Sequence, residues 1–290
     1  MKNTSSTLKP KKSALEIVFI VFCAIFFAIF IISYAYAGFW IFANAFNDPQ
    51  AFLENPFALP KGLNFDNIVT AFTITQKGFN IIGMTWNSLK LIIIHSICSI
   101  GFPPLVGYIF ARYNFKLKKF LINLFIITAT IPMIGTTAIT YRLCVSLNLV
   151  NNYMWEIIAS SSSLGFGTVI FMNYFGGLNK ELMEAAELDG AGRFRTYFSI
   201  MFPQAWPMLM ASMVLGAIGS WNNFMTTYLY YPDFPNVAYG LQAINVELVT
   251  YGSNYPVMFA IMIYTIGFAV ILYAVFSKKI ATNMVTSGLK

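Results

Sequence analysis

Long apolar stretches without charged residues dominate the hydrophobic and polar pattern of this chain. Six such runs, between 21 and 37 residues long, are each bracketed by charged residues. A transmembrane helix needs about 20 mainly apolar residues, so each run is long enough to cross a bilayer. We therefore expect an all-α polytopic membrane protein in which residues 1–290 form a single transmembrane domain. The pattern predicts six membrane-spanning helices near residues 17–42, 86–110, 120–142, 154–176, 205–229 and 256–277.

The composition excludes the soluble classes. Hydrophobic residues make up 58% of the 290 residues, and charged residues only 10%, whereas a soluble domain carries about 25% charged residues. Such a chain is neither a soluble globular enzyme nor a disordered segment. Membrane lipid is its expected environment.

The basic residues predict the orientation of the six spans. Fourteen of the 18 Lys and Arg residues fall on one side of the predicted membrane, and the positive-inside rule makes that side cytoplasmic. An even number of spans then places both termini in the cytoplasm. The net charge of +7 follows from this topology and implies no nucleic-acid partner. These basic residues are Lys2, Lys9, Lys11, Lys12, Arg112, Lys116, Lys118, Lys119, Lys180, Arg193, Arg195, Lys278, Lys279 and Lys290.

The sequence carries little chemistry of its own. Its only histidine, His95, lies within the predicted helix 86–110, where we expect a hydrogen-bonded interior side chain. The three cysteines are far apart, and no metal site, catalytic residue or bound cofactor is expected. The chain has no phosphate-binding loop and no carboxylate in the centre of an apolar run. Any transport through it is therefore expected to be driven from outside the chain.

The segment 178–203, between the fourth and fifth predicted spans, differs from its surroundings. Glutamates recur at i, i+3 and i+6, at Glu181, Glu184 and Glu187, among strong helix formers. Gly190 offers the left-handed conformation that ends a helix. The apolar spacing from Phe194 to Met201 then predicts a second short helix, with one apolar face on the membrane surface. Two short helices joined at a glycine are expected on the cytoplasmic side.

A longer motif runs through the same segment. Glu184-Ala185-Ala186 is followed after three residues by Gly190, after nine more by Ile200, and then by Phe202-Pro203. This order resembles the EAA loop of binding-protein-dependent ABC importer permeases, EAA-x3-G-x9-I-x-L-P, with Phe202 in place of leucine. The run Asp189-Gly190-Ala191 is similar to that of the carbohydrate permeases of this family.

The resemblance implies a function and a set of partners. The chain would be a permease subunit in a bacterial cell membrane that imports a sugar or oligosaccharide, and segment 178–203 would couple it to a pair of cytoplasmic ABC ATPases, which bind ATP and magnesium. A second permease subunit of different sequence and an extracytoplasmic solute-binding protein, meeting the outward loop 230–255, would complete the importer. The residues carried over to the coupling role are Glu184, Ala185, Ala186, Asp189, Gly190, Ile200 and Pro203.

Polar and aromatic residues within the predicted spans are candidates for the substrate path. An indole stacks on the apolar face of a sugar ring, and side-chain amides bind hydroxyl groups. The same residues serve equally well in helix packing, so both interpretations stay open. The principal candidates are Asn173, Trp221, Asn222 and Asn223, and further ones are Thr136, Thr140 and Ser160 to Ser163.

Two other classes of protein compete with this interpretation. A self-contained six-helix channel or secondary transporter predicts an internal repeat, a pore loop or buried carboxylates. An intramembrane enzyme needs paired catalytic residues at membrane depth. The sequence offers no sign of either set.

Overall fold

The computed structural model describes residues 13–130, 135–161, 165–251 and 254–287, which are mostly helical. The expected all-α class holds apart from one small hairpin, in which Thr75–Gln76 pairs antiparallel with Phe79–Asn80. The described elements, in chain order, are α1 (Ala14–Asn44), α2 (Pro49–Glu54), α3 (Asp66–Thr73), β1 (Thr75–Gln76), β2 (Phe79–Asn80), α4 (Ile81–Arg112), α5 (Lys118–Thr130), α6 (Thr136–Ser146), α7 (Met154–Ser160), α8 (Phe166–Gly177), α9 (Glu181–Leu188), α10 (Arg193–Thr196), the π-helical turn η1 (Tyr197–Met201), α11 (Phe202–Gln204), α12 (Trp206–Asn222), α13 (Phe224–Tyr230), α14 (Val237–Asn245), the π-helical turn η2 (Val246–Tyr251) and α15 (Tyr255–Ser287).

Three of the predicted spans are long single helices. α1, α4 and the Tyr255–Ala274 part of α15 are each long and apolar enough to cross a membrane. A fourth candidate consists of Arg193–Gln204 and Trp206–Asn222, which are bent by 70° relative to each other. The described residues thus hold three such helices, or four with the bent pair.

The other predicted spans are interrupted. The stretch 120–142 is divided between α5 and α6, and the stretch 154–176 between α7 and α8. Gly135 precedes α6 with φ +80°, which no residue inside an α-helix can adopt, and Gly165 precedes α8 in an extended conformation. Residues 131–134 and 162–164 lie outside the described part of the chain. Hydrophobicity predicts an apolar stretch but not where its backbone leaves the helical region.

The predicted helix 205–229 is also two helices, because Asn223 separates α12 from α13. Asn223 has φ −89° and ψ +97°, outside the helical region. Its side-chain Oδ1 accepts a hydrogen bond from the Thr226 backbone N–H at 3.1 Å. Asn223 therefore ends one helix and caps the next, as short amide side chains commonly do.

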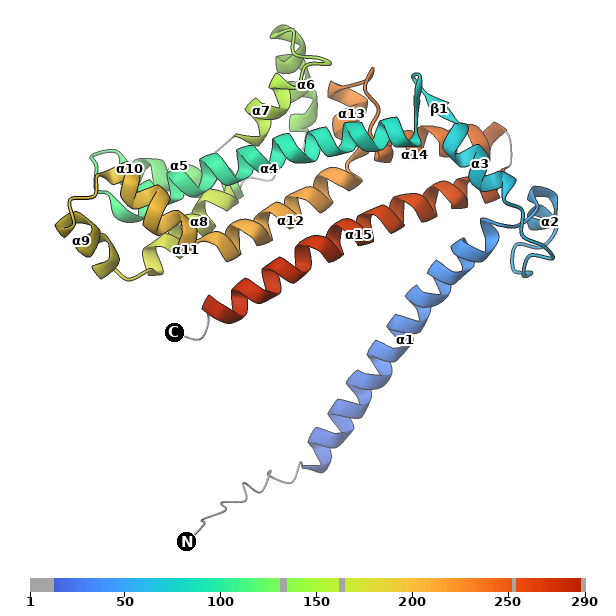
Figure 1. Ribbon diagram of the computed structural model, residues 1–290, viewed down its shortest axis with the longest axis horizontal. Helices are drawn as coiled ribbons and strands as arrows, with labels where there is room; N and C mark the ends of the chain where they lie inside the picture. The colour runs from blue at the N-terminus through green and yellow to red at the C-terminus, as the bar shows by residue number, and fades with distance from the viewer. Residues whose placement is uncertain (1–12, 131–134, 162–164, 252–253, 288–290) are drawn as a thin grey trace.

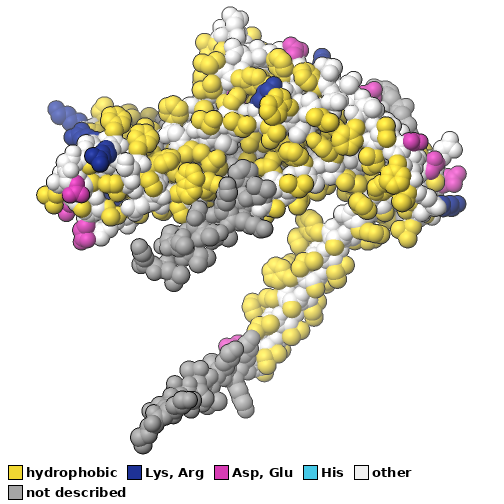
Figure 2. Space-filling model, in the orientation of Figure 1, with side chains coloured by type: hydrophobic (Ala, Val, Ile, Leu, Met, Phe, Trp, Pro, Cys, Tyr) yellow, Lys and Arg dark blue, Asp and Glu magenta, His cyan; other side chains and the backbone are white. Residues whose placement is uncertain are grey.

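The long helices form an elongated body with distinct ends (Figure 1). α4, α12 and α15 run side by side, and α8 packs closely on α4. The short helices α9, α10 and α11 gather at one end, while α2, α3 and the hairpin lie at the other. α1 diverges from the body and meets α15 near the hairpin end. Apolar side chains cover the middle of the face seen in Figure 2, and charged side chains lie toward both ends and along the upper edge.

Two buried clusters stabilise the ends of this body. At the end that carries α9 to α11, Tyr108, Phe175, Tyr197 and Met201 form a tight aromatic and sulfur-containing core. Toward the hairpin end, a larger cluster joins α4, α12, α14 and α15 around residues such as Trp221. The cavity described below lies beside α4 and α12.

Gly107 sets the distance between α4 and α8, and it supplies a test of the packing. A Cβ atom at Gly107 would lie 2.8 Å from both the Met172 backbone nitrogen and the Phe171 Cβ. We expect Gly107→Ala to force the helices apart and to destabilise the fold by about 1–3 kcal/mol, measured as a lower Tm in detergent. Gly101→Ala on the same helix is the matched control, because its Cβ would meet nothing within 4 Å. Equal melting temperatures for the two variants would contradict this account.

Candidate functional site

Segment 178–203 forms two helical stretches that meet at Gly190. α9 ends at Leu188, and the second stretch runs through α10, η1 and α11. Gly190 has φ +72°. The Ala191 N–H donates to the Ala186 carbonyl at 2.9 Å, and the Gly190 N–H donates to the Glu187 carbonyl at 3.0 Å. This pair of bonds is the Schellman arrangement, which needs a left-handed residue and therefore favours glycine at position 190.

The inner face of this segment is fixed to the body. Ala186, Tyr197 and Met201 are buried, and the Tyr197 ring lies 4.9 Å from that of Tyr108 on α4. Arg112 at the end of α4 donates from Nη2 to the Leu178 carbonyl at 2.6 Å. The segment is therefore in contact with α4 at several points.

The outer face of the segment is exposed and mixes acidic and apolar side chains. Glu184, Ala185 and Asp189 are exposed, as are the large side chains of Leu188 (90%) and Phe194 (78%). Exposed apolar side chains of this size at the tip of a short helix pair favour contact with another surface.

The second stretch does not have the single apolar face that its spacing predicts. Tyr197 and Met201 point inward, whereas Phe194 and Phe198 are exposed. The π-helical turn contributes to this difference, since the Phe202 N–H bonds the Tyr197 carbonyl five residues back. Four apolar side chains spaced for an ordinary α-helix are thereby divided between two directions.

The last residues of the motif lie where this stretch meets α12. Ile200 is half-buried against the aromatic cluster, and Pro203 is exposed in the first turn of α11. The chain then bends by 70° into α12. The motif thus joins the exposed tip at Leu188 to the start of a long helix.

A second feature, a cavity of about 410 Å³, lies between α4, α7, α12 and α13. Its size falls within the range of about 300–1,000 Å³ that is usual for small-molecule sites. It combines aromatic rings, hydroxyl groups, an amide and glycines. The described residues that line it are His95, Trp155, Glu156, Ala159, Ser160, Gly216, Gly219, Ser220, Asn223, Thr226 and Tyr230.

A chain of polar contacts runs along one wall of this cavity. The Ser160 hydroxyl donates to Glu156 Oε1 at 2.8 Å and lies 3.0 Å from His95 Nδ1. His95 Nδ1 is also 3.6 Å from Glu156 Oε1. The prediction that His95 is hydrogen-bonded is confirmed, but its side chain is 33% exposed rather than interior. Glu156, the acidic neighbour of His95, was not predicted as part of a site, because it stands at the border of an uncharged run. The i, i+4 spacing between Glu156 and Ser160 was the feature of the sequence that indicated their contact.

This wall does not have the geometry of a serine hydrolase. In a catalytic triad the histidine uses one ring nitrogen for the serine and the other for the carboxylate. Here Ser160 and Glu156 both face Nδ1 of His95. The arrangement orients a carboxylate and offers no activated nucleophile.

Aromatic side chains enclose the same region. The Trp155 and Tyr230 rings lie 5.3 Å apart. Next to them, burial raises the pKa of the Tyr231 phenol, and the nearby Glu156 charge raises it further.

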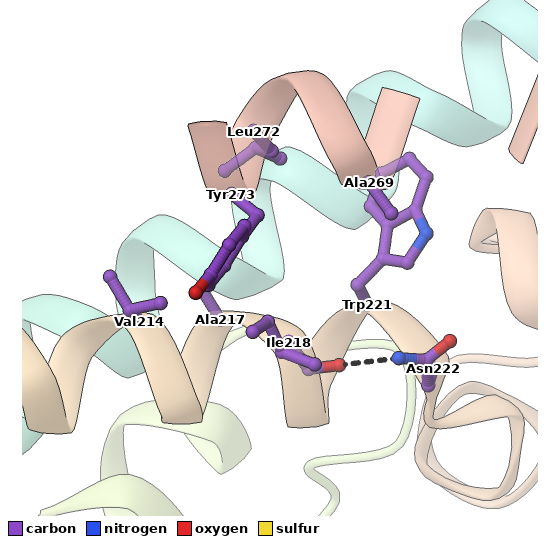
Figure 3. A pocket seen from close by; sticks show the side chains of 8 residues that line it. All are labelled: Val214, Ala217, Ile218, Trp221, Asn222, Ala269, Leu272 and Tyr273. Carbon is purple, nitrogen blue, oxygen red and sulfur yellow. Dashed lines mark hydrogen bonds between the residues drawn. The ribbon is translucent and has the colours of Figure 1, made fainter. Parts of the chain in front are cut away.

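The structure separates the principal substrate-path candidates. Asn223 lines the cavity, but Trp221 is only 3% exposed and stacks on Phe268 with ring centroids 4.8 Å apart. Figure 3 shows Trp221 and Asn222 around a different space, of about 30 Å³, where the Asn222 side chain donates to the Ile218 carbonyl at 2.9 Å. That space holds little more than a water molecule.

The remaining candidates are scattered. Asn173 is exposed on α8 and is not among the cavity-lining residues. Thr140 donates back to the Thr136 carbonyl within its own helix, whereas Ser160 belongs to the cavity wall. Ser162 and Ser163 lie outside the described residues.

Comparison with known proteins gives concordant matches. Residues 104–281 match the family described as "Binding-protein-dependent transport system inner membrane component". The chain is 32% identical to the arabinooligosaccharides transport system permease protein AraQ of Halalkalibacterium halodurans, over 80% of this chain and 81% of the relative. It is 28% identical to the maltodextrin transport system permease protein MalD of Streptococcus pneumoniae, over 62% of this chain and 64% of the relative. The fold resembles a chain in the crystal structure of a bacterial ABC transporter that imports the acidic polysaccharide alginate, with a TM-score of 0.77, 22% identity, and coverage of 93% of this chain and 99% of that one.

Proposed function

The chain belongs to the family of binding-protein-dependent transport system inner membrane components, and on that premise we propose that it carries a sugar or oligosaccharide across a bacterial membrane as the permease subunit of an ABC importer. It is a multi-pass membrane protein whose family supplies a path for transport rather than a catalytic centre. The proposal of a saccharide substrate rests on one observation, the resemblance of this chain to an oligosaccharide permease over most of its length. A self-contained channel or secondary transporter is not favoured.

We propose six membrane crossings, three of them by interrupted helices. In this topology α5 with α6 forms the third crossing, α7 with α8 the fourth, and α12 with α13 the fifth. Both termini are then cytoplasmic, which agrees with the concentration of basic residues on one side. Interrupted helices are tolerated at membrane depth where they line a cavity, and α7 and α13 both do so here.

The segment from α9 to α11 is the proposed contact with a pair of cytoplasmic ATPases. Its exposed glutamates together with Leu188 and Phe194 suit a groove that has both basic and apolar walls. ATP and magnesium are then bound by the partner, and this chain binds no cofactor. Closure of the ATPases would move α9 and α10 as a unit, and the anchored core would pass that movement to α4 and α12.

The cavity between α4, α7, α12 and α13 is the proposed part of the substrate path. Trp155 and Tyr230 provide apolar ring surfaces, while Ser220 and Asn223 offer hydrogen bonds to hydroxyl groups. A second permease subunit of different sequence would close the path from the other side. An extracytoplasmic solute-binding protein would deliver the sugar at the outward loops, including residues 230–255.

Co-purification tests this proposal. We expect the tagged chain, extracted from its native membrane in mild detergent, to bring with it an ATPase that carries a phosphate-binding loop and a second polytopic permease, both identified by mass spectrometry. The sugar bound to the solute-binding protein of the same system would then identify the cargo. Recovery of the chain alone as a homo-oligomer would contradict the proposal and favour a self-contained channel or carrier.

A further inference from the structure

The wall of the cavity carries one carboxylate that the proposed sugar path does not require. Glu156 is only 8% exposed, yet it faces the cavity from the first turn of α7. A buried carboxylate is costly unless hydrogen bonds hold it. Here Ser160 donates to it, and His95 from α4 lies within 3.6 Å. The site therefore maintains a charge where a neutral side chain would fill the same space at lower cost.

The polar chain can hold this carboxylate without neutralising it. A neutral His95 with its proton on Nδ1 donates to Ser160, and Ser160 donates to Glu156, so each group finds a partner. Among the described residues that line the cavity, none is Lys or Arg. With His95 neutral, the wall carries the negative charge of Glu156, which is only 8% exposed and therefore less screened by water than a surface charge.

We propose that Glu156 makes this cavity selective for uncharged over anionic saccharides. This inference rests on the proposed function, because it assigns a specificity to the proposed path. A neutral sugar offers hydroxyl groups that can donate to the Glu156 carboxylate and accept from Asn223 or Ser220. An acidic glycan, such as the alginate in whose import the structural neighbour is involved, would place carboxylates beside Glu156 with no Lys or Arg in the described wall to separate them.

The charge in the cavity can be measured without knowing the sugar. Ser220→Cys places a reporter thiol in the wall, and Cys23, Cys98 and Cys144 are first replaced by alanine. The probes are two methanethiosulfonates of similar size, one neutral with a hydroxyethyl group and one anionic with a sulfonatoethyl group. Their reaction rates are followed by intact-protein mass spectrometry on the assembled transporter in membranes. Ala58→Cys, at an exposed loop position between α2 and α3 that lies outside the proposed membrane crossings, gives the reference ratio.

We expect the anionic probe to react about tenfold more slowly relative to the neutral probe at position 220 than at position 58. Glu156→Gln should raise the anionic rate about tenfold and leave the neutral rate unchanged. Glu247→Gln is the matched control, because Glu247 is an exposed carboxylate outside the cavity that bonds Gln76. It should leave both rates as they were.

Three outcomes would overturn the inference. They are equal relative rates at positions 220 and 58, an anionic rate that Glu156→Gln leaves unchanged, and a cavity closed to both probes. Asn223→Cys is a second reporter in the same wall, and it decides the result if the Ser220→Cys chain does not fold. The probe rates require neither ATP nor sugar, so they can fail while the importer assignment stands. Isolation of the chain without an ATPase would contradict the importer assignment and leave the measured cavity charge intact.

Discussion

Gly190→Val should reduce sugar uptake at least tenfold while the chain still inserts into the membrane. Valine is β-branched and does not tolerate the φ of +72° found at this position. Holding it there costs about 1–3 kcal/mol, which the chain can avoid by opening the Schellman turn and changing the angle between α9 and α10. The segment from α9 to α11, the proposed contact with the ATPase pair, then no longer fits its partner. Uptake assays, together with the amount of ATPase captured by the tagged chain, measure both consequences.

Gly192 provides the matched control for this substitution. Like Gly190 it is exposed, and a Cβ atom at either glycine would meet nothing within 4 Å. Gly192 has φ −68° and ψ +161°, which valine adopts readily. Gly192→Val should therefore retain uptake, and Gly190→Asn should recover much of it, because asparagine tolerates the left-handed region. Equal loss of uptake in the two valine variants would show that side-chain bulk, rather than backbone conformation, is the cause. Unaffected uptake in Gly190→Val would contradict the coupling role.

The position of Gly190 was predictable from sequence because a helix end is a local event. A run of helix formers followed by a glycine specifies its own hydrogen bonds, whichever proteins surround it. The three long helices were predictable for a similar reason, since their uncharged length alone defines them. It was not predictable that the apolar side chains from Phe194 to Met201 point in two directions, because a π-helical turn changes the helical spacing on which that prediction relied.

The cavity could not be predicted from the sequence because its wall is formed by residues from distant parts of the chain. His95 and Ser160 are 65 residues apart, and only the packing of α4 against α7 brings them together. Asn223 and Trp221 look alike as candidates in the sequence, yet they lie on different sides of α12. Two residues of separation on a helix correspond to a rotation of about 200°. The break at Asn223 adds to this difference, because the backbone of residue 223 no longer follows the helical rotation of α12.

Gly219→Phe should block transport while the chain folds and assembles. Gly219 lines the cavity, and a Cβ atom there would meet nothing within 4 Å, so the added ring has room to enter the open space rather than the packed core. A phenyl group that occupies this space competes directly with a sugar ring. We expect uptake of the sugar recovered from the solute-binding protein to fall at least tenfold, with the amount of captured ATPase unchanged.

Gly267→Phe on α15 isolates the effect of position from that of size. Gly267 is also a helical glycine whose Cβ would meet nothing within 4 Å, but it does not line the cavity. The same ring placed there should leave uptake within about twofold of the unsubstituted chain, since single substitutions outside packed or functional regions usually have small effects. Full uptake by Gly219→Phe would place the sugar path elsewhere. A path confined to the cavity predicts that only the ring at position 219 obstructs transport. Equal loss of uptake in both variants would therefore mean that the helix bundle tolerates no added volume at either position.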